Sequence, residues 1–334
     1  MRTFVTGIAG FMGSHLAREA LDRGWEAAGI DSMLASTASA PDGAHWEKAD
    51  CCDSASYQHL LDGVDVVYHC AAAPYEGLSV FSPEIVFRNT LSSTVALLRA
   101  SINAGVKRFV FTSSMSRYGH GAAPFTEDMP TAPVDPYGIA KVAAEEAVKN
   151  LCGLHQVEWV ISVPHNVFGP GQRYWDPYRN VPAIMANRVL AGKPPVIYGD
   201  GSHRRSLSYI ADVVAPMITL ADHPAAAGEV FNVGPGGAGV TIRDLAHKII
   251  RLAGADLEPE FYPDRPSEVR DAYCSDEKTR QVLGYECQWD LDAGLEKLIA
   301  WIAERGPREF DYHLPLEITN TPLQTPRTWT ERLM

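Results

Sequence analysis

Short apolar runs alternate with longer amphipathic stretches through the first half of the chain. The apolar runs have the length and composition of buried strands, and they occupy Thr3–Thr6, Glu26–Ile30, Val64–His69, Phe109–Thr112 and Glu158–Val163. The stretches between them have helical length and spacing, and they occupy Met12–Arg23, Ser54–Leu61, Phe87–Ala104 and Pro136–Leu151. Strands that alternate with helices in this way form a parallel sheet with helices on both faces. The pattern therefore predicts an α/β protein built on a doubly wound parallel sheet.

The first strand leads directly into a glycine turn that opens a helix. Gly7, Gly10 and Gly13 follow a G-x-x-G-x-x-G spacing, and the second apolar run ends in Asp31. Such glycines permit a tight turn and a close approach of the backbone to a pyrophosphate, which binds at the helix N-terminus. An acidic residue about 20 positions later accepts hydrogen bonds from the adenosine ribose. The segment predicts a Rossmann-type dinucleotide site, and Asp31 favours NAD because its carboxylate repels the 2′-phosphate of NADP.

The residue composition of the chain changes after about residue 166. Glycine, proline, aromatic and basic residues then mix, as in Gly169-Pro170-Gly171 and in the loop from Arg173 to Arg179. We expect residues 1–166 to form the NAD-binding domain, with return segments near 210–233. Residues 167–209 and 234–313 are expected to form a smaller substrate lobe. Residues 314–334 read as a C-terminal tail that lies over the body or over a partner subunit.

Composition narrows the class of protein and its partners. The 334 residues carry a net charge of −12, with 46% hydrophobic and 21% charged residues. The negative charge argues against nucleic acid and anionic membranes as partners. We expect a cytoplasmic protein, because the N-terminus enters the first strand directly and no apolar run approaches the length of a membrane span. The six cysteines form no Cys-x-x-Cys pair, so we expect reduced thiols and no metal site.

A second motif, Asp135-Pro136-Tyr137-Gly138-Ile139-Ala140-Lys141, predicts the chemistry. Asp135 suits a helix N-cap and Pro136 the first helical position, so Tyr137 and Lys141 share one face of an early turn. An ammonium beside a phenol stabilises the phenolate, and we expect it to lower the pKa of Tyr137. Ser114 stands at the end of the preceding strand. Together these residues predict proton exchange with a sugar hydroxyl.

With both motifs the chain resembles the extended short-chain dehydrogenase/reductase superfamily, and within it the NAD-dependent nucleotide-sugar epimerases. The resemblance runs from Arg2 to about Gly284. Its further motifs are Asp50-Cys51, His69-Cys-Ala-Ala-Ala73, Asn89, Thr112-Ser-Ser114, Tyr118-Gly119, Asn166-Val-Phe-Gly-Pro170, Tyr198-Gly-Asp-Gly201, Arg205 and Arg265.

The resemblance implies roles for residues at each end of the site. Tyr137, Lys141 and Ser114 would be catalytic. Cofactor contacts are implied for Gly7, Gly10, Phe11, Met12, Gly13, Asp31, Ser32, Asp50, Cys51, Ala71, Ala72, Ala73, Asn89, Thr112, Tyr137, Lys141, Pro164 and His165. Substrate contacts are implied for Ser114, Met115, Ser116, Asn166, Asn180, Val181, Val196, Tyr198, Arg205, Arg265 and Glu268. Arg205 and Arg265 would hold the diphosphate, since guanidinium groups match phosphate oxygens.

Residues after the catalytic strand favour one branch of the superfamily. Related dehydratases and decarboxylases carry an acid immediately after the serine or threonine, whereas this chain has Ser114-Met115-Ser116. We therefore expect C4 epimerisation of a UDP-sugar, either UDP-glucose/UDP-galactose or UDP-glucuronate/UDP-galacturonate. The alternatives are another nucleotide-sugar oxidoreductase, such as a reductase or dehydratase, and a non-catalytic NAD-binding regulator. The family also suggests a homodimer through the helices at Phe87–Ala104 and Pro136–Leu151.

Three assignments stay open at this point. His165 follows a strand end and has either a pocket role or a structural one. Arg117 is either a surface charge or a ligand of a substrate carboxylate. Either Ala272 or Tyr273 marks the position at which a bulky residue narrows the sugar pocket in relatives.

Overall fold

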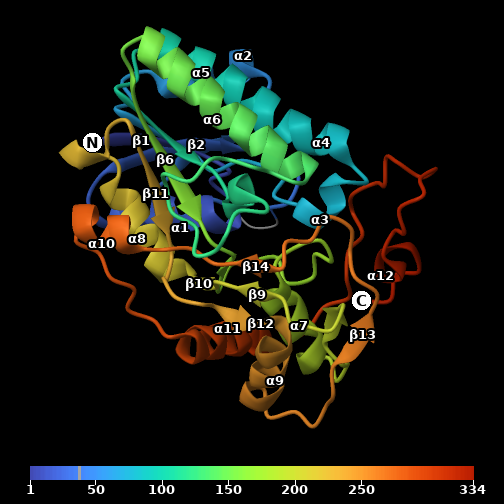
Figure 1. Ribbon diagram of the computed structural model, residues 1–334. Helices are drawn as coiled ribbons and strands as arrows, with labels where there is room; N and C mark the ends of the chain where they lie inside the picture. The colour runs from blue at the N-terminus through green and yellow to red at the C-terminus, as the bar shows by residue number, and fades with distance from the viewer. Residues whose placement is uncertain (37–38) are drawn as a thin grey trace.

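The central feature of the computed structural model, which describes residues 1–36 and 39–334, is a seven-stranded sheet (Figure 1). Its strands are β1 (Arg2–Thr6), β2 (Glu26–Asp31), β3 (His45–Lys48), β4 (Val66–His69), β5 (Arg108–Thr112), β6 (Glu158–Pro164) and β11 (Glu229–Val233). Every neighbouring pair is parallel, in the order β11-β6-β5-β4-β1-β2-β3. The chain thus winds outward in both directions from the centre of the sheet. The predicted doubly wound Rossmann-type fold is confirmed.

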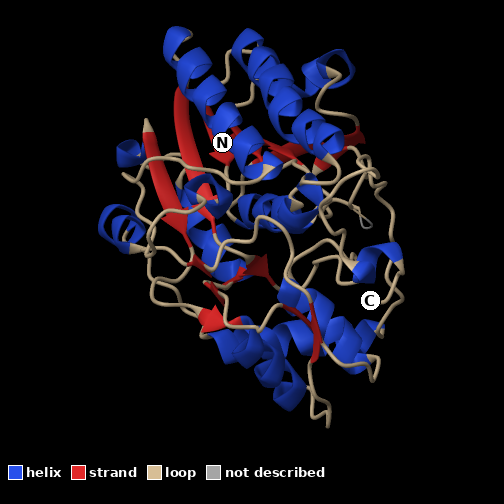
Figure 2. Cartoon of the chain, turned by 45° about the vertical axis from the view of Figure 1, so that its right-hand side comes forward, coloured by secondary structure: helices blue, strands red, loops and turns tan. Residues whose placement is uncertain are grey.

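Helices cover both faces of this sheet (Figure 2). One face carries α2 (Ser54–Tyr57), η1 (Gln58–Leu61), α4 (Pro83–Phe87), η2 (Arg88–Ser92), α5 (Ser93–Asn103) and α6 (Pro136–Leu154). The other carries α1 (Phe11–Asp22) and α8 (Ile210–Thr219). The strands are apolar on both faces: in β4, Val67 packs with the first group, and Val66 and Tyr68 pack with the second. Within residues 1–36 and 39–334, no helix combines the length and apolar character needed to cross a membrane.

Two local features differ from the sequence-based expectation. The stretch expected as one helix over Phe87–Ala104 is divided by the π-helical turn η2. In that turn the Asn89 amide donates to the Ile85 carbonyl at 2.7 Å. Strand β3 was not predicted because His45–Lys48 is half-exposed and polar, which is typical of an edge strand and hides the apolar signal.

Most of the chain after β6, apart from α8 and β11, packs against the carboxyl ends of the strands, below the sheet in Figure 1. Its core lies between three helices, α7 (Val181–Leu190), α9 (Ile242–Leu252) and α11 (Leu291–Arg305). Short strands connect them: β7 (Val167–Phe168), β8 (Val196–Tyr198), β9 (Arg204–Arg205), β10 (Ser208–Tyr209), β12 (Val240–Thr241), β13 (Glu260–Tyr262) and β14 (Asp271–Ala272). The remaining elements are α3 (Glu76–Ser79), η3 (Met115–Tyr118), η4 (Pro224–Ala226), α10 (Glu277–Leu283) and α12 (Arg327–Thr330). The proposed domain boundaries remain a prediction.

The C-terminal tail lies over the body of its own chain, along the right side of Figure 1. The Ser82 hydroxyl donates to the Pro315 carbonyl at 2.6 Å. The Trp329 ring stacks edge-on against Tyr178 with centroids 5.3 Å apart, and the Tyr198 hydroxyl lies 2.5 Å from the Thr328 hydroxyl. These contacts answer the question that the sequence left open about the tail.

Gly13 is required for the close packing of α1 on the glycine turn. A Cβ atom at this position would lie 2.1 Å from the Gly7 carbonyl oxygen, a backbone atom that cannot move aside cheaply. Gly153, near the end of α6, offers a contrast because a Cβ atom there meets nothing within 4 Å. Alanine substitutions at these two glycines therefore distinguish the effect of a steric clash from the effect of helix propensity.

We expect Gly13→Ala to lower the free energy of unfolding by about 1–3 kcal/mol, the usual cost of overpacking a tight contact. Gly153→Ala serves as the control and should be neutral or stabilising by up to about 1 kcal/mol. Urea unfolding followed by circular dichroism measures both. Equal stability of the two variants would contradict the role of Gly13.

Candidate active site

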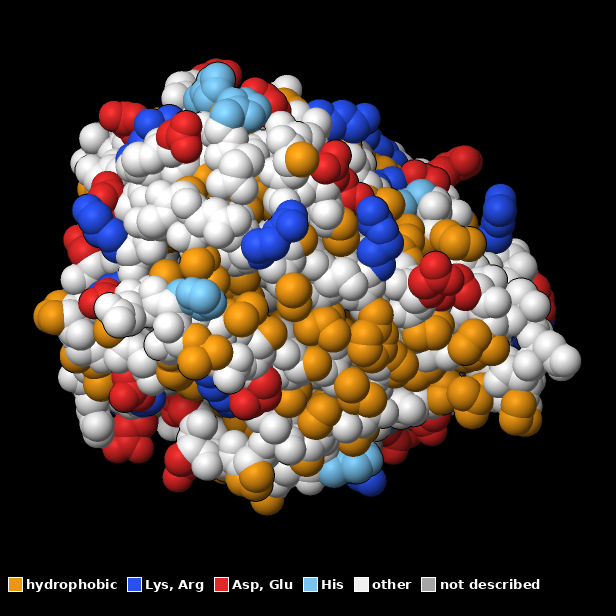
Figure 3. All heavy atoms as spheres, turned by 90° about the horizontal axis from the view of Figure 1, so that it is seen from above, with side chains coloured by type: hydrophobic (Ala, Val, Ile, Leu, Met, Phe, Trp, Pro, Cys, Tyr) orange, Lys and Arg blue, Asp and Glu red, His pale blue; other side chains and the backbone are white. Residues whose placement is uncertain are grey.

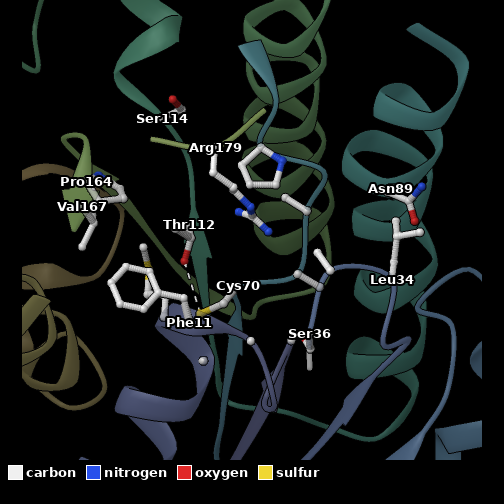
Figure 4. Close-up of a pocket in the computed structure, with 18 of the residues that line it drawn as sticks. Phe11, Leu34, Ser36, Cys70, Asn89, Thr112, Ser114, Pro164, Val167 and Arg179 are labelled. Carbon is white, nitrogen blue, oxygen red and sulfur yellow. Dashed lines mark hydrogen bonds between the residues drawn. The ribbon is translucent and has the colours of Figure 1, made fainter. Parts of the chain in front are cut away.

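A cavity opens at the carboxyl edge of the sheet and brings most of the predicted cofactor residues together (Figure 4). Its walls include Gly7, Gly10, Phe11, Met12, Gly13, Asp31, Ser32, Asp50, Cys51, Ala71, Ala72, Asn89, Thr112, Ser114, Tyr137, Lys141 and Pro164. The edge is common to β1, β2, β4, β5 and β6, which explains why residues far apart in sequence meet there. Figure 4 shows Arg179 extending into this cavity from the opposite side.

The glycine turn and Asp31 fit a dinucleotide. A Cβ atom on Gly10 would lie 3.0 Å from the Gly7 carbonyl and 3.8 Å from Asp31 Oδ2, so only glycine leaves the backbone of the turn bare. The Asp31 carboxylate is ordered by the Met33 amide at 2.7 Å and the Ser36 hydroxyl at 2.9 Å. The N-terminus of α1 faces the same cavity, where its free N–H groups suit a pyrophosphate.

Helix α6 carries Tyr137 and Lys141, the predicted catalytic pair. Asp135 caps the helix, since its Oδ1 accepts from the Gly138 amide at 2.9 Å, and Pro136 opens it. Tyr137 and Lys141 both face the cavity and are almost fully buried. Lys141 Nζ donates to the Thr112 carbonyl at 2.6 Å and lies 5.8 Å from the centre of the Tyr137 ring.

The expected lowering of the Tyr137 pKa is wrong for the chain alone. Burial raises the pKa of Tyr137 well above its usual value, and the nearby Glu76 carboxylate raises it further, while the Ser114 hydroxyl opposes both. Burial also lowers the pKa of Lys141 to about 8. The sequence argument counted the ammonium as a neighbour but could not include the loss of water around both groups. At neutral pH the phenol on its own holds its proton.

A hydrogen-bonded chain connects Ser114, the predicted catalytic serine, to a carboxylate from another element. The Ser114 and Ser116 hydroxyls lie 3.0 Å apart, and the Ser116 hydroxyl donates to Glu76 Oε1. Glu76 begins α3, immediately after the stretch that follows β4. The structure thus supplies a carboxylate where the run Ser114-Met115-Ser116 itself has none.

A second cavity adjoins the first and brings the predicted substrate residues together. Its walls include Met115, Ser116, Asn166, Asn180, Val181, Val196, Tyr198, Arg205, Arg265 and Glu268. Glu268 bridges the two arginines, with Oε1 at 3.1 Å from Arg205 and 2.9 Å from Arg265. Burial alone would raise the pKa of Glu268, but the two guanidinium groups bring it down to about 2. The arginine pair is therefore assembled and held in place by a carboxylate.

Two predicted cofactor residues do not line either of these cavities. Ala73 is buried beside them, and His165 is fully buried. Neither ring nitrogen of His165 has a hydrogen-bond partner among the described residues, and burial lowers the pKa of this histidine to about 4. A cofactor contact of either residue remains a prediction.

The structure also places Arg117, Ala272 and Tyr273, and the match of either of the last two to the position in relatives stays a prediction. Arg117 is neither a surface charge nor a cavity residue, because its guanidinium forms a buried ion pair with Glu145 at 3.0 Å. Ala272 lines the second cavity, whereas Tyr273 does not line either cavity.

Two charged residues that line both cavities were not assigned to the site from the sequence. Arg179 lies in the aromatic and basic loop that the sequence marks, but its contacts could not be derived from spacing. Glu76 follows the carboxyl end of β4, and that position was its one available signal. Both residues line both cavities, so the charge at their junction is set by residues that no motif marks.

Comparison with known proteins assigns the family. A sequence model of the NAD dependent epimerase/dehydratase family matches residues 3–234. The chain belongs to this family. It is an enzyme family that uses NAD, in agreement with the glycine turn and Asp31, and the match includes the whole Tyr137–Lys141 segment.

Individual relatives of this epimerase/dehydratase chain cover nearly its whole length. The UDP-glucose 4-epimerase of Mycolicibacterium smegmatis is 35% identical, over 92% of this chain and 100% of the relative. The crystal structure of UDP-glucose 4-epimerase from Thermotoga maritima with UDP-glucose has a TM-score of 0.87 at 29% identity, covering 91% of this chain and 99% of that one. The UDP-glucuronic acid 4-epimerase of Bacillus cereus, in complex with UDP-glucuronic acid and NAD, has a TM-score of 0.85 at 26% identity, covering 92% and 100%. A dTDP-glucose 4,6-dehydratase of Streptomyces niveus also matches, at 28% identity over 96% of this chain and 98% of the relative.

The helix cap Asp135 gives this family member a pH-dependent stability. Burial raises the pKa of Asp135 from 3.8 to about 7, and the Glu76 carboxylate adds to the effect. The folded state therefore binds this proton more tightly than the unfolded chain does. The stabilising contribution is complete below about pH 4 and is lost as the pH rises through about 7.

We expect Asp135→Asn, which keeps an acceptor for the Gly138 amide, to remove this dependence. Relative to wild type, the variant should gain about 1–3 kcal/mol of unfolding free energy between pH 5 and pH 8. The control is Asp290→Asn, which alters the cap of α11, whose exposed carboxylate accepts from the Ala293 amide at 2.8 Å. The Asp290 variant should shift stability equally at both pH values. The same result for Asp135 would contradict its raised pKa.

Proposed function

We propose that this protein catalyses the reversible C4 epimerisation of a UDP-sugar, UDP-glucose/UDP-galactose or UDP-glucuronate/UDP-galacturonate, through a transient 4-keto sugar. The observation that supports this most is the position of Tyr137 and Ser114 on the cofactor cavity, next to the arginine-lined substrate cavity. A sugar joined to a diphosphate at Arg205 and Arg265 can present its ring to both. The names of the relatives point to the same reaction.

In this proposal Tyr137 exchanges a proton with the oxygen on C4, and Ser114 holds that oxygen. Lys141 fixes the end of β5 against α6 and supplies positive charge near the phenol. When bound, NAD would supply reversible hydride transfer at C4, and its positively charged ring would favour ionisation of a nearby phenol. Gly7, Gly10, Gly13 and Asp31 would hold it.

The diphosphate has to stay bound while the sugar ring turns over. Arg205 and Arg265 present fixed guanidinium groups, and Glu268 keeps them oriented before substrate arrives. Phosphate oxygens would then share these donors with Glu268. Preassembly of this kind lowers the ordering cost of binding. We propose that residues 167–209 and 234–313 form the substrate lobe, which binds the diphosphate through these arginines.

Dehydration is the second candidate, and one observation favours it. Glu76 reaches Ser116 and so places a carboxylate beside the catalytic hydroxyls. Removal of water from the sugar requires an acid or base besides Tyr137, and Glu76 could act as one. Dehydration would leave a 4-keto-6-deoxy sugar with a methyl group.

The test is an NMR time course with UDP-glucose, UDP-glucuronate and UDP-N-acetylglucosamine in parallel, without added cofactor. The proposal expects interconversion of one C4 pair and no net change in nicotinamide absorbance. A new methyl signal would assign dehydration, and consumption of NADH supplied in a separate reaction would assign a reductase. NAD binding without any sugar turnover would indicate a regulator.

Removal of the phenol oxygen should separate chemistry from binding. We expect Tyr137→Phe to lower kcat by about 10²–10⁴-fold, the usual contribution of a positioned acid–base group. NAD content, measured by absorbance after denaturation, should equal that of the wild type, because Tyr137 is one of many contacts. A variant that has lost its NAD would instead show a structural role.

We also propose a two-fold homodimer through α5 and α6, as the family suggests. Seen from above, hydrophobic side chains form a broad patch over the face on which these helices lie (Figure 3). Val95 on α5 is 42% exposed and Ile139 on α6 is 46% exposed. Large apolar side chains on the outer faces of two packed helices are typical of an interface.

If α5 and α6 form the dimer interface, Val95→Glu and Ile139→Glu should convert the dimer into monomer, because each would bury an unpaired charge. Size-exclusion chromatography with light scattering measures the mass. Phe261→Glu is the control, since Phe261 is 50% exposed but lies on β13 in the other half of the molecule. Wild-type mass in both α5/α6 variants would refute this interface.

A further inference from the structure

The sugar of a UDP-sugar has to lie where the two cavities meet. The cofactor cavity carries Tyr137 and the substrate cavity carries Arg205 and Arg265. The residues that line both are Pro74, Glu76, Met115, Asn166, Arg179 and Asn180. Only Glu76 and Arg179 in this set are charged. Their balance decides which charge the sugar itself can carry.

The positive charge of Arg179 is partly compensated by a buried carboxylate. Its Nε lies 3.3 Å from Asp176, whose carboxylate is fully buried, and its guanidinium stacks 4.9 Å over the Tyr75 ring. The neighbouring arginines are also paired with carboxylates. Arg173 pairs with Asp311 at 2.5 Å, and Arg117 pairs with Glu145 inside the core.

The negative charge of Glu76 lacks a direct ion pair, although the charges of Arg205 and Arg265 on the same cavity act on it at longer range. Its hydrogen-bond partner is the neutral Ser116 hydroxyl, and within residues 1–36 and 39–334 no Lys, Arg or His lies within 4.0 Å of its carboxylate. A second carboxylate, Asp135, lines the substrate cavity nearby, and the Ser79 hydroxyl lies 3.5 Å from it. The raised pKa of Asp135, caused by burial and then by Glu76, shows that the two carboxylates repel each other.

We propose that Glu76 is a specificity-determining residue that makes the sugar subsite accept an uncharged hexose and reject a hexuronate. This inference rests on the proposed function and chooses between its two substrate pairs. A hexuronate would place its C6 carboxylate at the junction, where Glu76 repels it and the facing guanidinium, Arg179, already shares its charge with Asp176. A hexose would place a hydroxyl there, which can donate a hydrogen bond to Glu76.

The experiment compares UDP-galactose with UDP-galacturonate as substrates of the NAD-loaded protein. Wild type should have a kcat/KM for the hexose at least about tenfold above that for the uronate, a ratio that one like charge at contact distance can produce. Glu76→Gln, which keeps the shape but not the charge, should reduce this ratio at least about tenfold. Ser116→Ala, which removes the hydrogen bond but leaves the charge, should keep the ratio near that of wild type.

Glu304→Gln is the matched control, because Glu304 is 76% exposed on α11 and lines neither cavity. Titration calorimetry with UDP-glucose and UDP-glucuronate gives the ratio of dissociation constants without turnover, so a slow variant is still informative. Equal use of the uronate by wild type, or an unchanged ratio in Glu76→Gln, would overturn the role of Glu76. Failure to epimerise either sugar would overturn the proposed function, and the dissociation constants would still decide the selectivity.

Discussion

A buried ammonium holds the catalytic helix to the sheet. Lys141 Nζ donates to the Thr112 carbonyl at 2.6 Å and packs 4.8 Å over the Phe111 ring, both at the end of β5. Because Tyr137 lies one turn earlier on the same face of α6, this contact also sets the phenol opposite the Ser114 segment that continues β5. Burial lowers the pKa of Lys141 to about 8, so the charge is kept at neutral pH at a cost in desolvation.

Electrostatic pairs assembled before any ligand binds shape the rest of the site. Glu268 holds the two arginines of the substrate cavity, and Asp176 holds Arg179 at the junction. A diphosphate can bind Arg205 and Arg265 beside Glu268 because its charge is large enough to compete with that of one carboxylate. A single sugar carboxylate carries less charge with which to compete with Asp176 for Arg179, and Glu76 beside Arg179 repels it. In the proposed function, binding of the diphosphate and selection of the sugar thus depend on the same arrangement of paired and unpaired charges.

The sequence predicts the parts of this site that depend on local spacing. The glycine turn, Asp31 and the Tyr137–Lys141 pair each lie within one turn or loop, so their geometry follows from the chain itself. Strand β3 was not predicted because it lies at the exposed edge of the sheet and carries polar residues. The role of Glu76 was not predicted because the proximity of α3 to Ser116 arises only in the folded chain. The raised pKa of Tyr137 was not predicted because the loss of water around the phenol is also a property of the folded chain. The substrate residues beyond Asn166 followed from resemblance, and the structure gathers them on one cavity.

The central claim is that the hydrogen on C4 leaves and returns to the same carbon while Tyr137 handles the proton. UDP-galactose carrying deuterium at C4, incubated with the protein as purified in ordinary water, tests this directly. NMR of the resulting UDP-glucose should show deuterium retained at C4. Loss of that deuterium to solvent would contradict the account.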